Sequence, residues 1–302
     1  LFKTSGKGGT HTKTCLVIAT KKPINEERKP IFMSEAKWCG NDSRGNKIEK
    51  NDLPKILDLY KKREKLEQKE ENNLGYLISP NYIKNNILAP RYYDPSPKIQ
   101  LNKLKETHDF KVIYDLVKNN VIELRTGNEV GKSSYGTGDI PFIRTSDISN
   151  WEVKIDPKHC VSEVIFKEYQ KKQDVKENDI LMVRDGTYLI GTCALITKYD
   201  TRIVYQSHLY KIRVIEPEVI SPYVLLAVLS SKPVISQIQS KRFTQDIIDS
   251  LGQRINELIL PIPKDKIILE RIHNTVKKSI EDRVESRELA RFAKSAVIDL
   301  NF

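Results

Sequence analysis

The chain has 302 residues, of which 51 are lysine or arginine and 40 are aspartate or glutamate, so its formal net charge is +11. No run of about 20 apolar residues and no signal peptide occurs, which argues against membrane insertion or secretion and favours a cytoplasmic protein. The positive charge favours a polyanionic partner such as nucleic acid. The four cysteines include no CxxC pair and the five histidines form no constellation with them, so no metal site is expected.

Residues 1–75 are predicted to form a small first domain. The apolar run 16–19 predicts an edge strand with Cys15 in the core. Residues 52–71 predict a helix, because Asp52 is a suitable N-cap, Pro54 fits the first turn, and apolar side chains recur on one face.

This first segment resembles the closing part of an N6-adenine DNA methyltransferase of the type I modification class. Thr12-Lys13-Thr14 precedes the apolar run as in that family. A second stretch of it is matched by Gly40, Asp42, Arg44-Gly45, Ile48, Asp52-Leu53-Pro54 and Ile56-Leu57. The resemblance implies S-adenosylmethionine as methyl donor in the complete enzyme. The glycine-rich cofactor loop and the Asn-Pro-Pro-Phe/Tyr tetrapeptide, which would hold a flipped adenine, do not occur in the sequence. We therefore expect no cofactor and no catalysis in this chain alone, and we interpret it as a fragment whose catalytic half precedes residue 1.

Residues 76–108 predict a proline-rich connector, because four prolines at positions 80, 90, 95 and 97 prevent a long helix. Residues 79–82, Ser-Pro-Asn-Tyr, are the nearest imitation of the missing tetrapeptide and are best interpreted as a turn. Arg91, Tyr92 and Tyr93 are able to stack on bases, but we favour a role in pinning the connector to a domain.

Residues 109–263 carry two patches with the same plan, an apolar strand that ends in a polar turn. In residues 127–151 a glycine-rich loop leads into the segment IPFIRTSDISN, and in residues 178–191 the segment NDILMVRDG ends in a tight turn that presents charge and hydroxyl at its tip. Gly127 to Ser133 is one residue short of a phosphate-binding GxxxxGK[ST] loop, and the glycines that follow exclude the helix that such a loop requires.

Rigid strands that aim arginine and hydroxyl side chains from turns suit contacts with phosphates and base edges. The order of the motifs resembles the target recognition domain of type I restriction-modification specificity subunits, over about residues 110–298. Candidate DNA-contacting residues are Lys132, Ser133, Tyr135, Arg144, Thr145, Ser146, Arg184, Asp185, Thr187, Tyr188, Lys241, Arg242 and Gln245. About half of them are equally well explained as turn formers or solvated charges.

Residues 264–302 predict a long C-terminal helix with an apolar stripe at Ile268, Ile272, Val276, Ile280 and Val284. Such a stripe must pack on its own domain, on another helix or on a second chain. The resemblance favours the last two, either a homodimer or the missing methyltransferase half.

Together these features predict an α+β protein with a mixed-sheet target recognition domain, flanking helices and a long C-terminal helix. Its expected function is to recognise a sequence in double-stranded DNA for an attached methyltransferase domain or subunit. The alternative is a protein-interaction scaffold with incidental DNA affinity. A nuclease is disfavoured, because no cluster of two carboxylates and a lysine has the spacing of a metal-dependent cleavage site.

Overall fold

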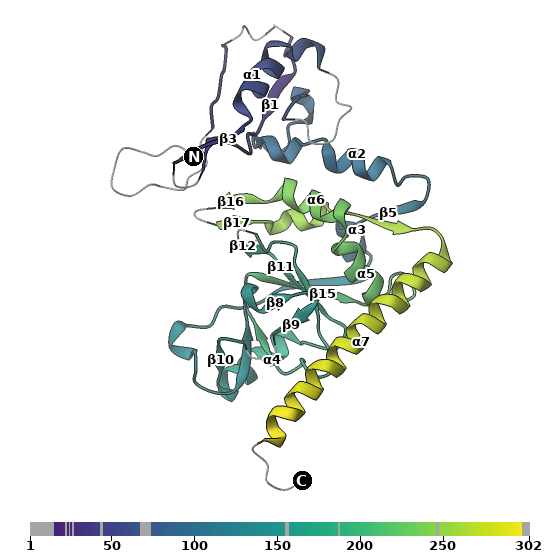
Figure 1. Ribbon diagram of the computed structural model, residues 1–302. Coiled ribbons are helices and arrows are strands. Elements are labelled where there is room, and N and C mark those ends of the chain that lie inside the picture. Colours follow the sequence, from purple (N-terminus) through teal and green to yellow (C-terminus); the bar gives the residue numbers. More distant parts are fainter. Residues whose placement is uncertain are drawn as a thin grey trace. The chain divides into compact units, whose positions relative to one another are not determined.

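The computed structural model describes residues 15–21, 23, 25, 27–42, 45–66, 74–154, 157–186, 188–245 and 248–297 (Figure 1). The chain divides into two compact units, Leu1–Gln100 and Leu101–Phe302. The division lies within the predicted connector 76–108. The boundaries of the four predicted segments stay a prediction.

In its described residues, the first unit contains two small antiparallel sheets, one helix and most of a second helix. Strand β1 (Ile31–Ser34) pairs with β4 (Gly75–Ile78), and β2 (Cys39–Asn41) pairs with β3 (Lys47–Asn51). Helix α1 (Leu53–Lys61) packs Tyr60 edge-on against Phe32 of β1, with ring centroids 5.5 Å apart. A 3-10 turn, η1 (Arg63–Lys65), follows α1.

Three expectations for the first unit are corrected. Leu16, Val17 and Ile18 form no strand and are exposed, and Cys15 is exposed as well, because no described strand pairs with this run. Helix α1 ends at Lys61, well before the predicted end at residue 71. Asp52 does precede α1, but its carboxylate accepts from the backbone N–H groups of Lys37 and Trp38, both at 2.8 Å, and so caps no helix nitrogen. Residues 12–14 and 44 of the methyltransferase-like motifs lie outside the described residues.

Much of the predicted connector packs on the first unit. Strand β4 is followed by the 3-10 turns η2 (Pro80–Tyr82) and η3 (Pro90–Tyr93), so residues 79–82 do form a turn. Arg91 makes an ion pair with Glu35, and the Tyr93 hydroxyl donates to the Ile87 carbonyl oxygen at 2.8 Å. These contacts agree with a pinning role for residues 91–93. Helix α2 (Ser96–Asn102) follows.

The second unit is built on a four-stranded antiparallel sheet in the order β13-β11-β15-β6. Its strands are β6 (Ile122–Thr126), β11 (Ile180–Val183), β13 (Cys193–Leu195) and β15 (Leu209–Val214). Side chains alternate along β11: Ile180 and Met182 belong to one hydrophobic cluster, and Leu181 and Val183 to another. Both faces of the sheet are therefore covered, which explains why this strand is apolar at every position.

Smaller sheets and short helices surround this sheet. In the first of them, β7 (Ile140–Ile143) pairs antiparallel with β10 (Cys160–Val161) and parallel with β14 (Val204–Tyr205), which makes the fold mixed as expected. The remaining elements before β14 are β5 (His108–Val112), α3 (Ile113–Lys118), η4 (Lys132–Ser134), η5 (Thr145–Asp147), β8 (Ile148–Ser149), β9 (Glu152–Val153), α4 (Glu163–Gln173) and β12 (Asp185–Gly186). After β15 come α5 (Pro222–Leu229), α6 (Lys232–Lys241), β16 (Phe243–Gln245), β17 (Ile248–Ser250), η6 (Gly252–Glu257) and β18 (Ile259–Pro263), which pairs with β5.

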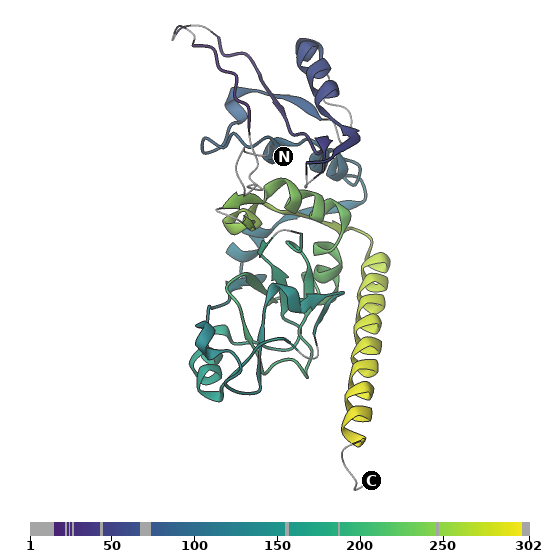
Figure 2. The ribbon, with the colours of Figure 1, turned by 60° about the vertical axis from the view of Figure 1, so that its left-hand side comes forward.

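Helix α7 (Lys266–Ala296) ends the second unit and runs along its side without a break (Figure 2). Val276 and Ile280 are buried in the cluster that also contains Leu225 and Leu226 of α5. The central part of the apolar stripe therefore packs on its own domain, which is one of the three environments that the sequence predicted. None of the described helices is long and apolar enough to cross a membrane.

Polar contacts also fix α7. The Arg287 guanidinium is buried and lies 3.1 Å from Asp200 Oδ2, and it donates to the Thr197 hydroxyl at 3.3 Å. One turn earlier, Arg283 donates to the carbonyl oxygen of Asn150, in the tight turn between β8 and β9. These contacts extend the docking of α7 beyond its apolar stripe.

Candidate nucleic-acid interface

Strand pairing brings the two sequence patches to one edge of the second unit. Val183 at the end of β11 pairs with Leu209 of β15, so that Arg184 lies opposite His208, and the Arg184 N–H donates to the His208 carbonyl oxygen at 2.9 Å. Ile143 at the end of β7 pairs with Tyr205 of β14, and the next residue, Arg144, therefore lies beside residues 206–208. The arginines of both patches thus flank one short segment.

The end of β6 reaches the same edge. The Gly127 N–H donates to the Leu209 carbonyl oxygen at 3.2 Å, and Asn128 donates to that of Tyr205 at 3.1 Å. A Cβ at residue 127 would lie well inside contact distance of the Tyr205 and Gln206 carbonyl oxygens. Glycine is required here because two backbone segments approach each other this closely.

Arg184 is half-buried and held from two sides. Its Nη1 donates to the Ser207 carbonyl oxygen at 3.4 Å, and its Nε lies 3.3 Å from Asp185 Oδ1. Arg144 is also half-buried, and its Nε has no hydrogen-bond partner among the described residues. Because the Nε atoms of both residues are themselves buried, only Nη donors of the two guanidinium groups remain for a ligand at this edge.

Asp185 corrects the expectation that the turn presents charge at its tip. Its side chain is buried, because β12 pairs with β17 and places Ser250 opposite it. Its Oδ1 accepts from the Ser250 hydroxyl at 2.6 Å, and its Oδ2 lies 2.8 Å from His208 Nδ1. The Asp185 carboxylate is thus engaged within the protein, and DNA contact by this residue stays a prediction.

The turn after Arg144 is built around another buried carboxylate. Asp147 Oδ2 accepts from the Arg144 N–H at 3.0 Å, and the Asp147 carbonyl oxygen accepts from the Lys154 N–H at 2.8 Å. Ser146 is exposed and Thr145 is partly exposed on this turn. Asp147 was not among the predicted DNA-contacting residues, and it shapes the turn that carries three of them.

The glycine-rich loop presents two of its three candidates. Lys132 and Ser133 are exposed on η4, whereas the Tyr135 ring stacks on His159 with centroids 4.4 Å apart and packs near Phe142. A turn and not a long helix follows Gly131, as expected from the glycines. Tyr135 is therefore partly engaged in packing its own loop.

The remaining candidates lie on α6, β16 and the turn after β12. Lys241 pairs with Glu257 at 2.9 Å and Arg242 with Asp249 at 3.5 Å, so both side chains have a partner within the protein. The backbone of Gln245 pairs with Ile248. Tyr188 is exposed, and Thr187 and the Gln245 side chain lie outside the described residues. DNA contact by each candidate stays a prediction.

Four residues at this edge were not among the sequence candidates. Glu129 accepts from the Ser207 hydroxyl and from Gln206 Nε2, the latter at 3.3 Å, and its Oε1 lies 3.9 Å from His208 Nε2. Residues 206–208 directly follow β14, and Arg144 directly follows β7. Only the parallel pairing of these two strands shows that the two segments lie side by side. A search for polar residues directly after short apolar strands would have found residues 206–208, but neither Glu129 nor the position of these residues beside Arg144.

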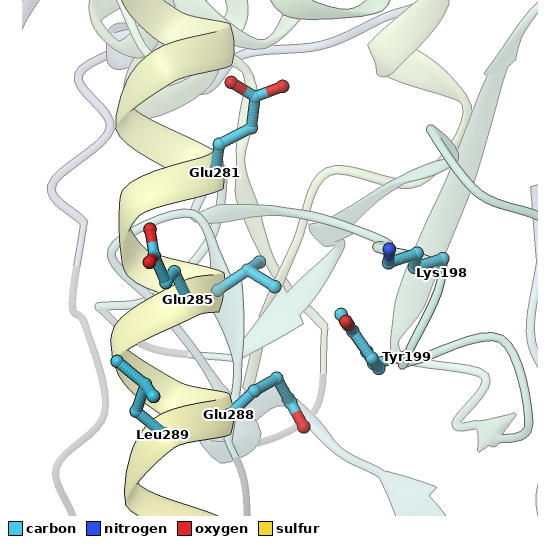
Figure 3. Close-up of a pocket in the computed structure, with 7 residues that line it drawn as sticks. Lys198, Tyr199, Glu281, Glu285, Glu288 and Leu289 are labelled. Atoms are coloured by element: carbon cyan, nitrogen blue, oxygen red, sulfur yellow. The ribbon is translucent and has the colours of Figure 1, made fainter.

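A separate groove of about 440 Å³ lies beside α7. Glu281, Glu285, Glu288 and Leu289 of the helix line it together with Lys198 and Tyr199, and the Glu288 side chain extends from the helix toward Tyr199 (Figure 3). Three carboxylates make it unsuited to phosphate, so it does not belong to the candidate interface. Near it, Leu289 and Phe292 are 61% exposed, which is unusual for large apolar side chains.

Comparisons with known proteins agree with the motif order. Residues 118–286 match the family model for the type I restriction modification DNA specificity domain. The S subunit of a type I restriction-modification system from M. genitalium is 15% identical with a TM-score of 0.42, and the match covers 59% of this chain and 40% of that chain. The HsdS subunit from Thermoanaerobacter tengcongensis is 14% identical with a TM-score of 0.37, over 64% of this chain and 45% of that one. The chain thus spans less than half the length of these two proteins.

No curated protein matches the chain. The family model, however, covers more than half of the 302 residues. The chain therefore belongs to the type I restriction-modification DNA specificity family, and its second unit contains a target recognition domain.

Proposed function

We propose that this chain binds double-stranded DNA and selects a sequence at which an N6-adenine methyltransferase acts. The observation that carries the proposal is the convergence of Arg144, Arg184 and residues 206–208 at one edge. Arginine reads guanine through its O6 and N7 atoms in the major groove, and the exposed Lys132 is suited to a phosphate. The strands behind these side chains are buried and rigid, which is what discrimination between bases requires.

The methyltransferase is proposed as a partner, with S-adenosylmethionine as the methyl donor bound by that partner. Support comes from the sequence resemblance of residues 1–75 to a methyltransferase end. The exposed Leu289 and Phe292 on α7 are a suitable contact for a further chain. A second copy of this chain on the same face is the alternative partner.

Selection from a randomised duplex library tests DNA recognition, followed by titration of the selected duplex across a range of salt concentrations. We expect enrichment of one sequence, and a linear fall of log affinity with log salt because bound lysines and arginines displace counterions. If the chain binds DNA but enriches no sequence, its affinity comes from electrostatic attraction alone and the proposed sequence selection is refuted. No binding at low salt would refute the DNA proposal.

The second candidate function, a protein-interaction module, is favoured by the groove beside α7 and by its exposed apolar neighbours. Sedimentation of the chain measures self-association, and the Phe292→Asp variant should abolish it if α7 is the contact. Lys278→Ala, an exposed change on the same helix, is the control. Self-association without any DNA binding would favour the interaction module over DNA recognition.

A further inference from the structure

We propose that His208 is a further base-reading residue of the DNA interface, and that Asp185 and Ser250 are its positioning residues. The inference rests on the proposed DNA recognition and assigns part of its specificity to a side chain opposite Arg184. It follows from three features of the edge: a fixed imidazole, one ring nitrogen left for a ligand, and a shared carboxylate.

The imidazole of His208 is fixed by a chain of hydrogen bonds. Ser250 Oγ donates to Asp185 Oδ1 at 2.6 Å, and Asp185 Oδ2 lies 2.8 Å from His208 Nδ1. Asp185 is 5% exposed and Ser250 is 6% exposed, so water does not compete for these bonds. Because an ionised carboxylate only accepts, Nδ1 carries the hydrogen and the ring orientation is set.

The second ring nitrogen is left for a ligand. The His208 side chain is 37% exposed, and its Nε2 lies 3.9 Å from Glu129 Oε1, which is beyond hydrogen-bond distance. Glu129 already accepts from Ser207 and Gln206. A neutral imidazole held in this way offers an acceptor to the amino group of adenine or cytosine, and a protonated one offers a donor to guanine.

One carboxylate orients two base readers. Asp185 Oδ1 lies 3.3 Å from Arg184 Nε, while Asp185 Oδ2 holds His208. The Arg184 N–H also donates to the His208 carbonyl oxygen at 2.9 Å. Arg184 and His208 therefore form a preorganised pair, with a spacing set by the backbone.

Two substitutions of His208 distinguish the role of its Nδ1 atom from that of its Nε2 atom. His208→Asn places an amide near the Nδ1 position and keeps a partner for Asp185, but removes the Nε2 atom. His208→Gln places an amide near the Nε2 position. His273→Asn is the matched control, because His273 is also partly exposed with Nδ1 3.0 Å from a hydroxyl, that of Ser221.

The selected duplex and its single base-pair variants are the probes, with the full chain and thermal melting as a check of folding. We expect His208→Asn to lose about threefold to tenfold discrimination at one base pair, the value of one hydrogen bond. The salt dependence should not change, His208→Gln should keep part of the discrimination, and His273→Asn should select as the wild type does.

Two results would overturn the assignment: His208→Asn that selects like the wild type, or one that weakens all sequences alike. If His208→Asn does not fold, His208→Gln decides, with a change at one base pair supporting the proposal and a uniform or absent change overturning it. A wild-type chain that selects no sequence overturns the proposed function itself and is distinguishable from these results.

Discussion

Gly127 is the residue on which the geometry of the interface edge depends most directly. It lets the end of β6 pass the carbonyl oxygens of Tyr205 and Gln206 at a distance that no side chain allows. We expect Gly127→Ala to reduce the free energy of unfolding by more than about 1 kcal/mol, because the backbone has to shift. Urea unfolding measures the change.

The control for this prediction is Gly131→Ala in the same loop, where an added Cβ would meet only the Ser133 hydroxyl at 3.5 Å. That variant should unfold like the wild type. Equal stability of the two variants would contradict the close approach at residue 127.

Arg184 and Lys132 are expected to contact different groups of the DNA, a base edge and a phosphate respectively. If Arg184 contacts a guanine, Arg184→Ala should cost roughly 1–3 kcal/mol on the selected duplex and relax selectivity at one base pair. Lys132→Ala should weaken all sequences about equally and lower the salt slope by about one unit. Affinities for the selected duplex and its variants at several salt concentrations measure both effects.

A uniform loss for Arg184→Ala would make it a backbone contact. Unchanged binding with a lower melting temperature would instead assign Arg184 to the structure of the turn, through Asp185 and Ser207.

At the residue scale, the sequence predicted where the two arginines lie along their strands, but not which side chains surround them. Arg144 and Arg184 follow apolar strands directly, and a strand end is visible in a sequence. The burial of Asp185 was not predicted because it depends on Ser250 of β17, which is 65 residues away in the chain. His208 was overlooked for the same reason, since only strand pairing places it opposite Arg184.

Among the elements, α7 shows how a polar contact extends a hydrophobic one. Arg287 is the buried partner of Asp200, and its removal leaves that carboxylate uncompensated in a dry site. We expect Arg287→Ala to cost about 3–5 kcal/mol of unfolding free energy. Arg291→Ala, one turn later on the same helix, removes a more exposed ion pair with Glu288 and should cost well under about 1 kcal/mol.

Chemical denaturation of the two variants measures the difference. Similar, small losses would mean that α7 is held by Val276 and Ile280 alone.

The loop after α4 provides a prediction on acid stability. A hydrogen bond from Arg213, with Nη1 2.6 Å from Asp174 Oδ2, lowers the pKa of the Asp174 carboxyl below its ordinary value. A carboxyl with a lowered pKa in the folded state stabilises the fold above the unfolded-state value of about 3.9, and this contribution is lost as the pH falls through the folded-state value.

We therefore expect the unfolding free energy of Asp174→Asn to fall less steeply than that of the wild type below about pH 5. Urea unfolding between about pH 3 and pH 7 measures it, with Asp282→Asn at an exposed pair as control. Identical slopes for the wild type and Asp174→Asn would contradict the role of the Arg213 contact.

At the element scale, the sequence predicted those helices and strands whose apolar side chains recur with the period of the backbone. The stripe of α7 and the apolar strands β7 and β11 were predicted because their side chains follow the period of their own backbone. The strand expected at residues 16–19 was wrong because an apolar run becomes a strand only when another strand pairs with it. The sequence also left open which partner covers the α7 stripe, and α5 of the same unit packs on its central part, Val276 and Ile280.

For the molecule as a whole, we expect no methyl transfer by this chain alone. The sequence has no Asn-Pro-Pro-Phe/Tyr tetrapeptide to hold a target adenine, and residues 79–82 form only a 3-10 turn. Incubation with labelled S-adenosylmethionine and the selected duplex should leave the DNA unlabelled relative to a heat-denatured control. Label above that control would show that the chain contains a catalytic site of another kind.

The buried Asp185 carboxylate, which is hydrogen-bonded to Ser250 and His208 and ion-paired with Arg184, also has an evolutionary consequence. A single replacement of Arg184 or His208 by a side chain without a suitably placed donor leaves the buried Asp185 carboxylate short of a partner. New specificities should therefore arise by joint replacement at positions 184, 185, 208 and 250, while the strands behind them are inherited unchanged. Divergence at this edge would proceed in concerted steps, with few viable single-substitution intermediates.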